Sequence, residues 1–124
     1  MKTEKRATVF RDVYANLPDR FVRKIDLDLK YILEKQIPGL QRVYLFGSCA
    51  RNEVRSTSDI DILIVTEKKL QDRGLAADIR WTLDEEKDGV RTDVVFMNEE
   101  TKVEASVFHA ELDRDKKLIL EVRG

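Results

Sequence analysis

Two aspartates, Asp59 and Asp61, stand at the start of an apolar run that ends at Val65. Alternate side chains of a β-strand point to opposite faces, so both carboxylates would project from the same face. Their Cα atoms would lie about 6.5 Å apart, and two carboxylates at that separation repel each other unless a cation lies between them. Oxygen ligands of this kind suit Mg²⁺, which typically takes one or two carboxylates together with substrate phosphates. The pair therefore predicts a magnesium site.

A glycine and a serine, Gly47 and Ser48, follow an earlier apolar run at residues 43–46. Glycine lets the backbone turn sharply and approach a ligand, because it has no Cβ. Ser48 is predicted to be the N-cap of a short helix over residues 49–53, and free N–H groups at a helix N-terminus attract anions. A phosphate-binding turn and an acidic pair on adjacent strands would meet around a metal–nucleotide complex. This arrangement predicts a reaction centre that acts on nucleotides.

Gly47-Ser48, ten intervening residues and Asp59-Ile60-Asp61 together resemble the signature of the DNA polymerase beta-type nucleotidyltransferase superfamily. The segments 48–51 (Ser-Cys-Ala-Arg) and 58–61 (Ser-Asp-Ile-Asp) are similar to those of its small prokaryotic branch, the minimal nucleotidyltransferases. The order of the elements predicted between residues 21 and 122 is also compatible with that family. One departure is Asn52, where the family more often has glycine. Asparagine tolerates left-handed backbone angles better than most residues, so we expect only a small local change there.

The resemblance implies an enzyme that transfers AMP from ATP onto an acceptor hydroxyl with the help of two Mg²⁺ ions. Three carboxylates would serve as metal ligands and catalytic groups, Asp59 and Asp61 bridging the ions and Asp93 binding the one that activates the acceptor. The residues implied in nucleotide binding are Gly47 and Ser48, which would hold the β- and γ-phosphates, Arg51, and Ser58, which would orient the acidic turn. Minimal nucleotidyltransferases often pair with HEPN proteins, ribonuclease toxins that they neutralise by transferring AMP to a toxin tyrosine. The resemblance therefore implies an antitoxin-type protein adenylyltransferase.

Two of these residues have an alternative role that the sequence leaves open. Asp93 is the only acidic residue in the middle of the strand predicted over residues 90–97, where aspartate is disfavoured by propensity. It either points from a neighbouring strand at the first two aspartates or faces solvent on an edge strand. Arg51, about one helical turn after Ser48, either reaches a phosphate oxygen or is a solvated helix arginine.

The composition limits the remaining classes of function. With 124 residues the chain is expected to form one domain, and a hydrophobic content of 42% is enough for a packed core. The formal net charge of -1 argues against broad binding of nucleic acids. The single cysteine, Cys49, and the single histidine, His109, form no zinc-binding cluster, and we interpret both as structural or surface residues. Without a signal-peptide pattern or an apolar run of about 20 residues, we expect a cytoplasmic protein with no membrane partner.

Apolar periodicity predicts the secondary structure. Helices are expected over residues 9–17, between Asp19 and Pro38, and over residues 68–87 and 99–113; strands are expected over residues 42–46, 59–65, 90–97 and 117–122. In the second helix the lysines and aspartates are expected opposite the apolar stripe, and Trp81 is expected to pack against the sheet or a neighbouring helix. These elements predict an α/β (α+β) nucleotidyltransferase fold, a small mixed sheet of about four strands flanked by helices. We divide the chain into an N-terminal helical extension, residues 1–18, and a minimal nucleotidyltransferase domain, residues 19–124.

Three other functions are compatible with the same residues. A small-molecule nucleotidyltransferase, such as one acting on aminoglycosides, would complete its acceptor pocket by forming a homo-oligomer. A non-catalytic antitoxin would neutralise its partner by binding alone. A domain whose acidic pair binds Ca²⁺ or nothing would leave the turn at Gly47 and Ser48 unexplained. The acceptor, the nucleobase and the oligomeric state stay open at this point.

Overall fold

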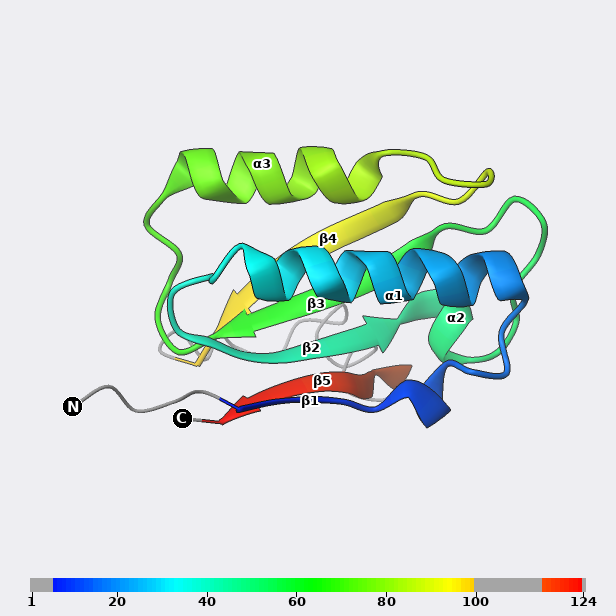
Figure 1. The fold of residues 1–124 in the computed structure, drawn as a ribbon, viewed down its shortest axis with the longest axis horizontal. Coiled ribbons are helices and arrows are strands. Elements are labelled where there is room, and N and C mark those ends of the chain that lie inside the picture. Colours follow the sequence, from blue (N-terminus) through cyan, green and yellow to red (C-terminus); the bar gives the residue numbers. More distant parts are fainter. Residues whose placement is uncertain (1–5, 100–114, 124) are drawn as a thin grey trace.

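A five-stranded mixed sheet with the strand order β1-β5-β2-β3-β4 forms the centre of the fold (Figure 1). The computed structural model describes residues 6–99 and 115–123. Within these ranges the elements are β1 (Arg6–Val9), the 3₁₀ helix η1 (Arg11–Val13), α1 (Asp19–Glu34), β2 (Leu40–Phe46), α2 (Gly47–Ala50), β3 (Ile60–Thr66), α3 (Arg73–Asp84), β4 (Thr92–Asn98) and β5 (Lys117–Arg123). The predicted fold class is confirmed, and the sheet has one strand more than predicted. The helix predicted over residues 99–113, which contains His109, lies outside the described residues apart from Glu99.

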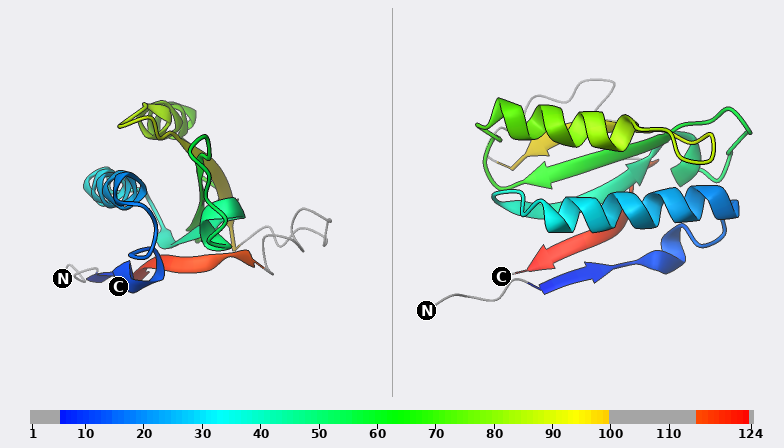
Figure 2. Two further views of the ribbon diagram at one scale, coloured as in Figure 1. Left: turned by 90° about the vertical axis from the view of Figure 1, so that its right-hand side faces the viewer. Right: turned by 45° about the horizontal axis from the view of Figure 1, so that its top comes forward.

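The sheet is covered on one face by two helices. β3 pairs with β4 in parallel, and the other neighbouring strands pair in antiparallel fashion. Figure 2 shows α1 and α3 side by side on the same face of the sheet. Every second residue of β3 contributes to the hydrophobic core with side chains of both helices; the members of this cluster include Ile60, Ile62, Ile64, Phe21, Ile25, Leu29, Ile32, Ile79 and Leu83. Alternation along β3 therefore leaves Asp61 for the other face.

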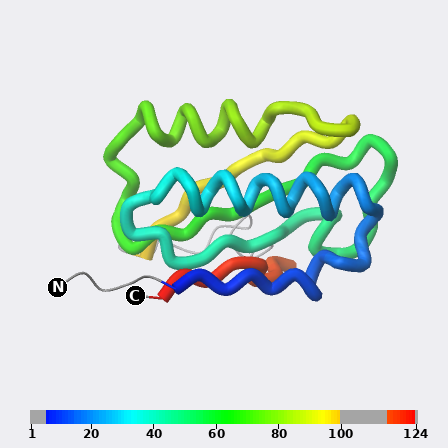
Figure 3. Tube along the Cα trace, viewed as in Figure 1, coloured from blue at the N-terminus to red at the C-terminus, as the bar shows by residue number. Residues whose placement is uncertain are grey.

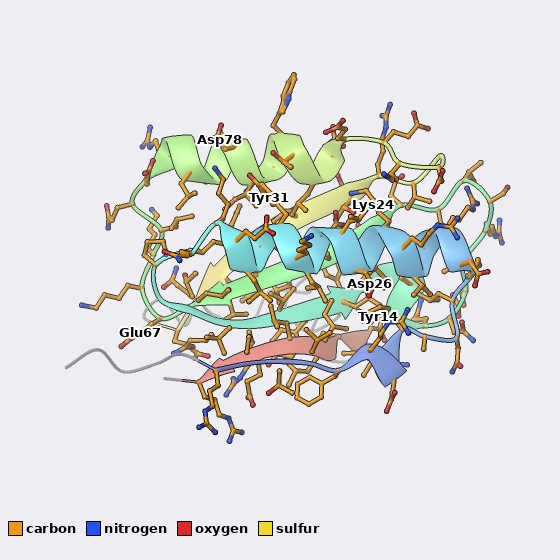
Figure 4. The ribbon with its side chains drawn as sticks, viewed as in Figure 1. Tyr14, Lys24, Asp26, Tyr31, Glu67 and Asp78 are labelled. Carbon is orange, nitrogen blue, oxygen red and sulfur yellow. The ribbon has the colours of Figure 1, made fainter. Side chains whose placement is uncertain are left out.

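The N-terminal segment forms a strand and a short 3₁₀ helix, so the helix predicted over residues 9–17 is wrong. β1 runs antiparallel to β5, which supplies the backbone hydrogen bonds that a helix would have made internally (Figure 3). The apolar spacing that suggested a helix has another cause, because Tyr14 and Leu17 belong to the loop before α1 and are buried in the hydrophobic core, while Val9 is exposed. The Tyr14 hydroxyl donates to Asp26 Oδ1 over 2.6 Å and anchors this segment to α1 (Figure 4).

An ion pair is buried on the apolar side of α1. Lys24 and Asp28 are each 3% exposed, and Lys24 Nζ donates to Asp28 Oδ1 over 2.6 Å. Lys24 also donates to the carbonyl of Leu83 in α3 over 2.9 Å, and the hydroxyl of Thr92 in β4 donates to Asp28 Oδ2. Burial raises the pKa of Asp28, although Lys24 and Thr92 act in the opposite direction. The prediction that the lysines and aspartates lie opposite the apolar stripe is wrong for this pair. Lys24 and Asp28 are four residues apart, so they lie next to each other on the same side of the helix as the apolar residues.

α3 is shorter than predicted and presents its tryptophan to solvent. It begins after Asp72, whose side chain accepts a hydrogen bond from Leu75 N over 2.9 Å. Ile79 and Leu83 occupy the buried side of the helix. Trp81 lies two residues from each, which at about 100° per residue places it on the opposite side. It is 83% exposed, so the prediction that it packs against the sheet or a helix is wrong.

The predicted turn between α3 and β4 is present. Asp88 and Gly89 have φ angles of 52° and 80°, and they connect Lys87 with Val90 across an antiparallel bridge.

Among the described ranges, none of the helices has the length and apolarity that a membrane span requires.

Replacing Lys24 with methionine is expected to lower the free energy of unfolding by about 3–5 kcal/mol, because the Asp28 carboxylate would remain buried without its counter-charge. The double variant Lys24→Met/Asp28→Leu should recover much of that loss, since it removes the second charge as well. Urea unfolding followed by circular dichroism measures both values. The matched control is Lys30→Met on the exposed side of α1, which should change stability by less than about 0.5 kcal/mol. Equal stability of Lys24→Met and the wild type would contradict a structural role for the ion pair.

Candidate functional site

Asp61 and Asp93 occupy paired positions on neighbouring parallel strands. The register of β3 and β4 places Asp61 opposite Asp93 and Ile60 opposite Thr92. Paired residues point to the same face of a sheet, and adjacent strands lie about 4.8 Å apart. Thr92 points toward α1, which its hydroxyl contacts, so the next residue along the strand points away from α1. The structure thus brings two of the three predicted carboxylates together on the sheet face opposite α1.

Asp59 is the last residue before β3 and shares the electrostatic environment of the other two carboxylates. Burial and then the charges of Asp93 and Asp59 together raise the pKa of the Asp61 carboxyl to about 6, although Arg51 acts in the opposite direction. Asp93 and Asp59 therefore lie close enough to Asp61 for their charges to disfavour its ionised form. In the described part of the chain, however, no three His, Cys, Asp or Glu side chains are arranged so as to hold a metal ion.

Gly47 lies directly against the Asp61 carboxylate. Its φ of +69° is in the left-handed region, and a Cβ at this position would overlap Asp61 Oδ2. Glycine alone has both the backbone freedom and the space that this approach requires. The helix α2 begins at Gly47 itself without any side-chain cap, so the prediction of Ser48 as the N-cap of a helix over residues 49–53 is wrong. Ser48 already lies inside the helical turn, where its carbonyl accepts a hydrogen bond from Glu53 N over 2.9 Å.

Asn52 and Ser58 shape the loop between α2 and β3. Asn52 has a φ of 57°, the left-handed conformation that asparagine adopts more readily than most residues. The Ser58 hydroxyl oxygen accepts a hydrogen bond from Arg55 N over 2.8 Å, and Ser58 N donates to the Arg55 carbonyl over 3.0 Å. Ser58 thereby closes a turn immediately before Asp59 and fixes the direction in which the acidic segment enters β3.

Arg51 is held beside the carboxylates by two acidic side chains. It forms ion pairs with Glu53 at 3.2 Å and with Asp115 at 3.3 Å. It lies near enough to Asp61 to lower the pKa of that carboxyl. Glu53 and Asp115 would compete with a phosphate for the Arg51 guanidinium, and the role of Arg51 in nucleotide binding stays a prediction.

Cys49 is buried behind the turn, in agreement with a packing role. Its Sγ lies 3.7 Å from the carbonyl oxygen of Asp59. Burial, together with the charges of Asp61 and Asp59, raises the pKa of the Cys49 thiol to about 12. Because the thiolate is the reactive form of cysteine, this thiol is not a nucleophile at neutral pH.

Arg20, which no sequence pattern indicated, connects the two segments that lead into the site. From the first turn of α1, Arg20 Nη2 donates to the Ser56 carbonyl over 2.8 Å and Nη1 donates to the Asp88 carbonyl over 3.4 Å. Ser56 lies in the loop before Asp59, and Asp88 lies in the turn before β4. These partners are 36 and 68 positions away in the chain, so no local pattern could have indicated the contact.

The chain resembles known proteins both in sequence and in fold. A protein-family model described as a nucleotidyltransferase domain matches residues 26–120, more than half of the chain. The chain belongs to this nucleotidyltransferase domain family. A candidate nucleotidyltransferase from Sulfolobus solfataricus is 28% identical, with a TM-score of 0.53 over 81% of this chain and 82% of that one. Comparison with curated proteins gave no match.

Toxin–antitoxin structures are also among the similar folds. A variant of the toxin–antitoxin MntA–HpeT that carries two Asp-to-Glu substitutions is 25% identical, with a TM-score of 0.51 over 73% of this chain and 70% of that one. A second variant, with a Tyr-to-Ala substitution, is 23% identical with a TM-score of 0.52 over 76% and 70%, and shows the fold alone. Family membership confirms the resemblance to nucleotidyltransferases, and it supports transferase activity that uses a nucleoside triphosphate and a divalent metal.

Replacing Gly47 with alanine is expected to destabilise the protein more than the same change at Gly39. Gly39 has a φ of +70° but only ordinary contacts around an added Cβ, so Gly39→Ala should cost about 1 kcal/mol from the backbone alone. Gly47→Ala should cost at least about 1 kcal/mol more, because the Asp61 carboxylate must also move. Chemical denaturation measures both losses. In an Asp61→Ala background the cost of Gly47→Ala should fall to that of Gly39→Ala, and an unchanged cost would show that the two residues do not meet.

Replacing Asp61 with asparagine is expected to raise the melting temperature of the metal-free protein by a few degrees at pH 8. The folded-state pKa of Asp61 is raised from 3.8 to about 6, so its ionised form disfavours the folded state once the pH exceeds that range. The gain should therefore shrink as the pH falls through 6 and vanish near 4. Thermal unfolding in EDTA across this range measures the difference between variant and wild type. Asp78→Asn on the exposed side of α3 is the control, and a pH-independent gain for Asp61→Asn would contradict the explanation.

Proposed function

We propose that this protein is a Mg²⁺-dependent adenylyltransferase that transfers AMP from ATP onto a tyrosine hydroxyl of a partner protein, a HEPN-type toxin. The observation that carries the proposal is the pairing of Asp61 with Asp93 on one sheet face, directly beside the left-handed turn at Gly47. Membership of the nucleotidyltransferase domain family supports the reaction class. The choice of partner rests on the resemblance to minimal nucleotidyltransferases and on the similar fold of a toxin–antitoxin structure.

Asp59, Asp61 and Asp93 would hold the metal, with two Mg²⁺ ions as the proposed number. The donor set fits, because carboxylate oxygens are the ligands that Mg²⁺ prefers. The electrostatics fit as well, because burial and the charges of Asp93 and Asp59 raise the pKa of Asp61, and a bound cation would offset the repulsion between these carboxylates. Binding would need side-chain rotation, since the three carboxylates do not yet form a cluster of metal-holding geometry in the described residues. When bound, Mg²⁺ would neutralise the triphosphate and stabilise the charge that develops during phosphoryl transfer.

The residues of the chain itself have three tasks. The turn at Gly47 and Ser48 would bind the β- and γ-phosphates through its backbone N–H groups, next to the Asp61 carboxylate that the missing Cβ of Gly47 admits. Arg51 would add a positive charge on leaving one of its acidic partners. Asp93, the more exposed partner of the Asp61–Asp93 pair, would accept the proton of the acceptor hydroxyl as that oxygen attacks the α-phosphorus and pyrophosphate leaves.

The proposal predicts that the purified protein with MgCl₂ and ATP adds AMP to the protein encoded beside it. Intact mass measurement after incubation with each of the four nucleoside triphosphates would identify donor, acceptor and reaction class together. Asp61→Asn should lower the transfer rate at least about 100-fold, because a ligand of the site is lost. Asp78→Asn is the matched control and should transfer AMP at the wild-type rate.

The outcomes separate the competing functions. Equal labelling by Asp61→Asn would refute the catalytic assignment. A modified aminoglycoside in place of a modified protein would identify a small-molecule enzyme instead. Neutralisation of the partner by a variant that lacks all three carboxylates would identify an antitoxin that acts by binding alone.

A further inference from the structure

A groove lies between α3 and β4, and Asp93 is one of the residues that line it. It has a volume of about 410 Å³, and its lining includes Arg80, Trp81 and Asp84 of α3 and Asp93 of β4. Because β4 is the last strand of the sheet, this α3–β4 groove lies at the edge of the described sheet. Its volume is within the range of about 300–1,000 Å³ that is typical of ligand sites. Apart from Asp93, the proposed binding of metal and nucleotide uses none of the described residues that line this groove.

Trp81 is the most exposed large hydrophobic side chain of the described residues. It is 83% exposed, whereas Val9, Val13 and Leu27 are between 36% and 44% exposed. Ile79, on the opposite side of α3, packs into the hydrophobic core. Trp81 is not one of the buried residues of this helix. Exposed tryptophan is enriched in the parts of protein surfaces that dominate binding energy. The groove therefore has an aromatic contact surface at one wall, and Asp93, a proposed metal ligand, is among the residues of β4 that line another.

The strand order places this groove on the side of Asp61 that is opposite to the proposed phosphate site. Gly47 follows β2, Asp61 lies in β3 and Asp93 lies in β4, which is the order of these strands in the sheet. In phosphoryl transfer the attacking and leaving oxygens lie roughly in line on opposite sides of the phosphorus. If the β- and γ-phosphates lie at the β2 side, the attacking hydroxyl must arrive from the β4 side. The α3–β4 groove opens on that side.

The charges of the groove favour a polypeptide over a polyanion. Its one cation, Arg80, lies against the ring of Phe96 at 5.1 Å from the centroid, and Asp84 and Asp93 contribute two negative charges. A nucleic acid would meet net repulsion there. A tyrosine brings both the hydroxyl that the reaction needs and an aromatic ring that packs well against an indole.

We infer that the α3–β4 groove receives the segment of the acceptor protein that carries the modified tyrosine, and that Trp81 is the residue on which this segment docks. The inference rests on the proposed function, whose acceptor it places. Trp81 then determines how well the acceptor binds, while nucleotide binding depends on the other side of Asp61.

The single tryptophan of the chain makes a direct test possible. Protein labelled with 5-fluorotryptophan gives one ¹⁹F resonance, which reports on Trp81 alone. A pentapeptide with tyrosine between glycines should shift this resonance, and the same peptide with alanine in place of tyrosine should not. No shift with the tyrosine peptide would overturn the inference. A shift caused by MgATP alone, or by raising the protein concentration alone, would also overturn it, in favour of a nucleobase contact or a second copy of the chain.

Kinetics with the acceptor protein give the second measurement. Trp81→Ala should raise KM for the acceptor about tenfold or more and leave kcat and KM for ATP within about twofold, because docking and chemistry use different residues. Trp81→Phe should restore most of the affinity, and Leu27→Ala, an exposed leucine outside the groove, should have no effect. Unchanged KM in Trp81→Ala, with AMP transfer intact in the wild type, would overturn the groove assignment alone. Absence of any transfer by the wild type would instead refute the proposed function.

Discussion

The parallel pairing of β3 with β4 is the constraint on which the site depends. The two strands follow one another in the chain through α3, a crossover that parallel strands require. Side chains alternate along a strand with a period of two, so a slip of one residue would turn Asp93 toward α1 and Thr92 toward Asp61. β3 resists such a slip because its residues from Ile62 to Thr66 are buried. The position of Asp93 beside Asp61 is thus a consequence of how the apolar residues of both strands are buried.

Polar contacts on the helix side add the precision that apolar packing lacks. The hydroxyl of Thr92 donates a hydrogen bond to the buried carboxylate of Asp28. Lys24 donates both to this carboxylate and to the carbonyl of Leu83 near the end of α3. A buried hydrogen bond has one acceptable partner, whereas an isoleucine packs against several neighbours. The network therefore fixes the side chain of Thr92, the first residue of β4, on the face toward α1. Because side chains alternate along a strand, the side chain of Asp93 must then lie on the opposite face. Arg20 adds a further constraint, because it donates hydrogen bonds to carbonyls in the two segments that precede Asp59 and Asp93 in the chain.

The sequence was most informative where a structure is determined locally. The apolar runs predicted β2, β3, β4 and β5 because a strand that is half or fully buried must show its pattern in its own residues. β1 was missed since its side chains are exposed and its existence depends on β5 at the other end of the chain. The carboxylates could be listed from their spacing, yet their common face follows from the β3–β4 register, which no local pattern contains. Trp81 was misjudged because hydrophobicity predicts burial only on average, and a binding surface is the usual exception.

The local conflicts of the fold are concentrated at the site. Gly39 and Gly89 also have positive φ angles, but of these three described glycines Gly47 is the one where a Cβ would overlap a carboxylate. Asp61 is partly buried and faces like charges, an arrangement that weakens the folded state and that a hydrophobic residue in β3 would avoid. Conflicts that serve no structural purpose persist where a function depends on them. Among the described carboxylates, Asp61 is thus one whose ionised form the fold disfavours, and this is the form that a bound cation would favour.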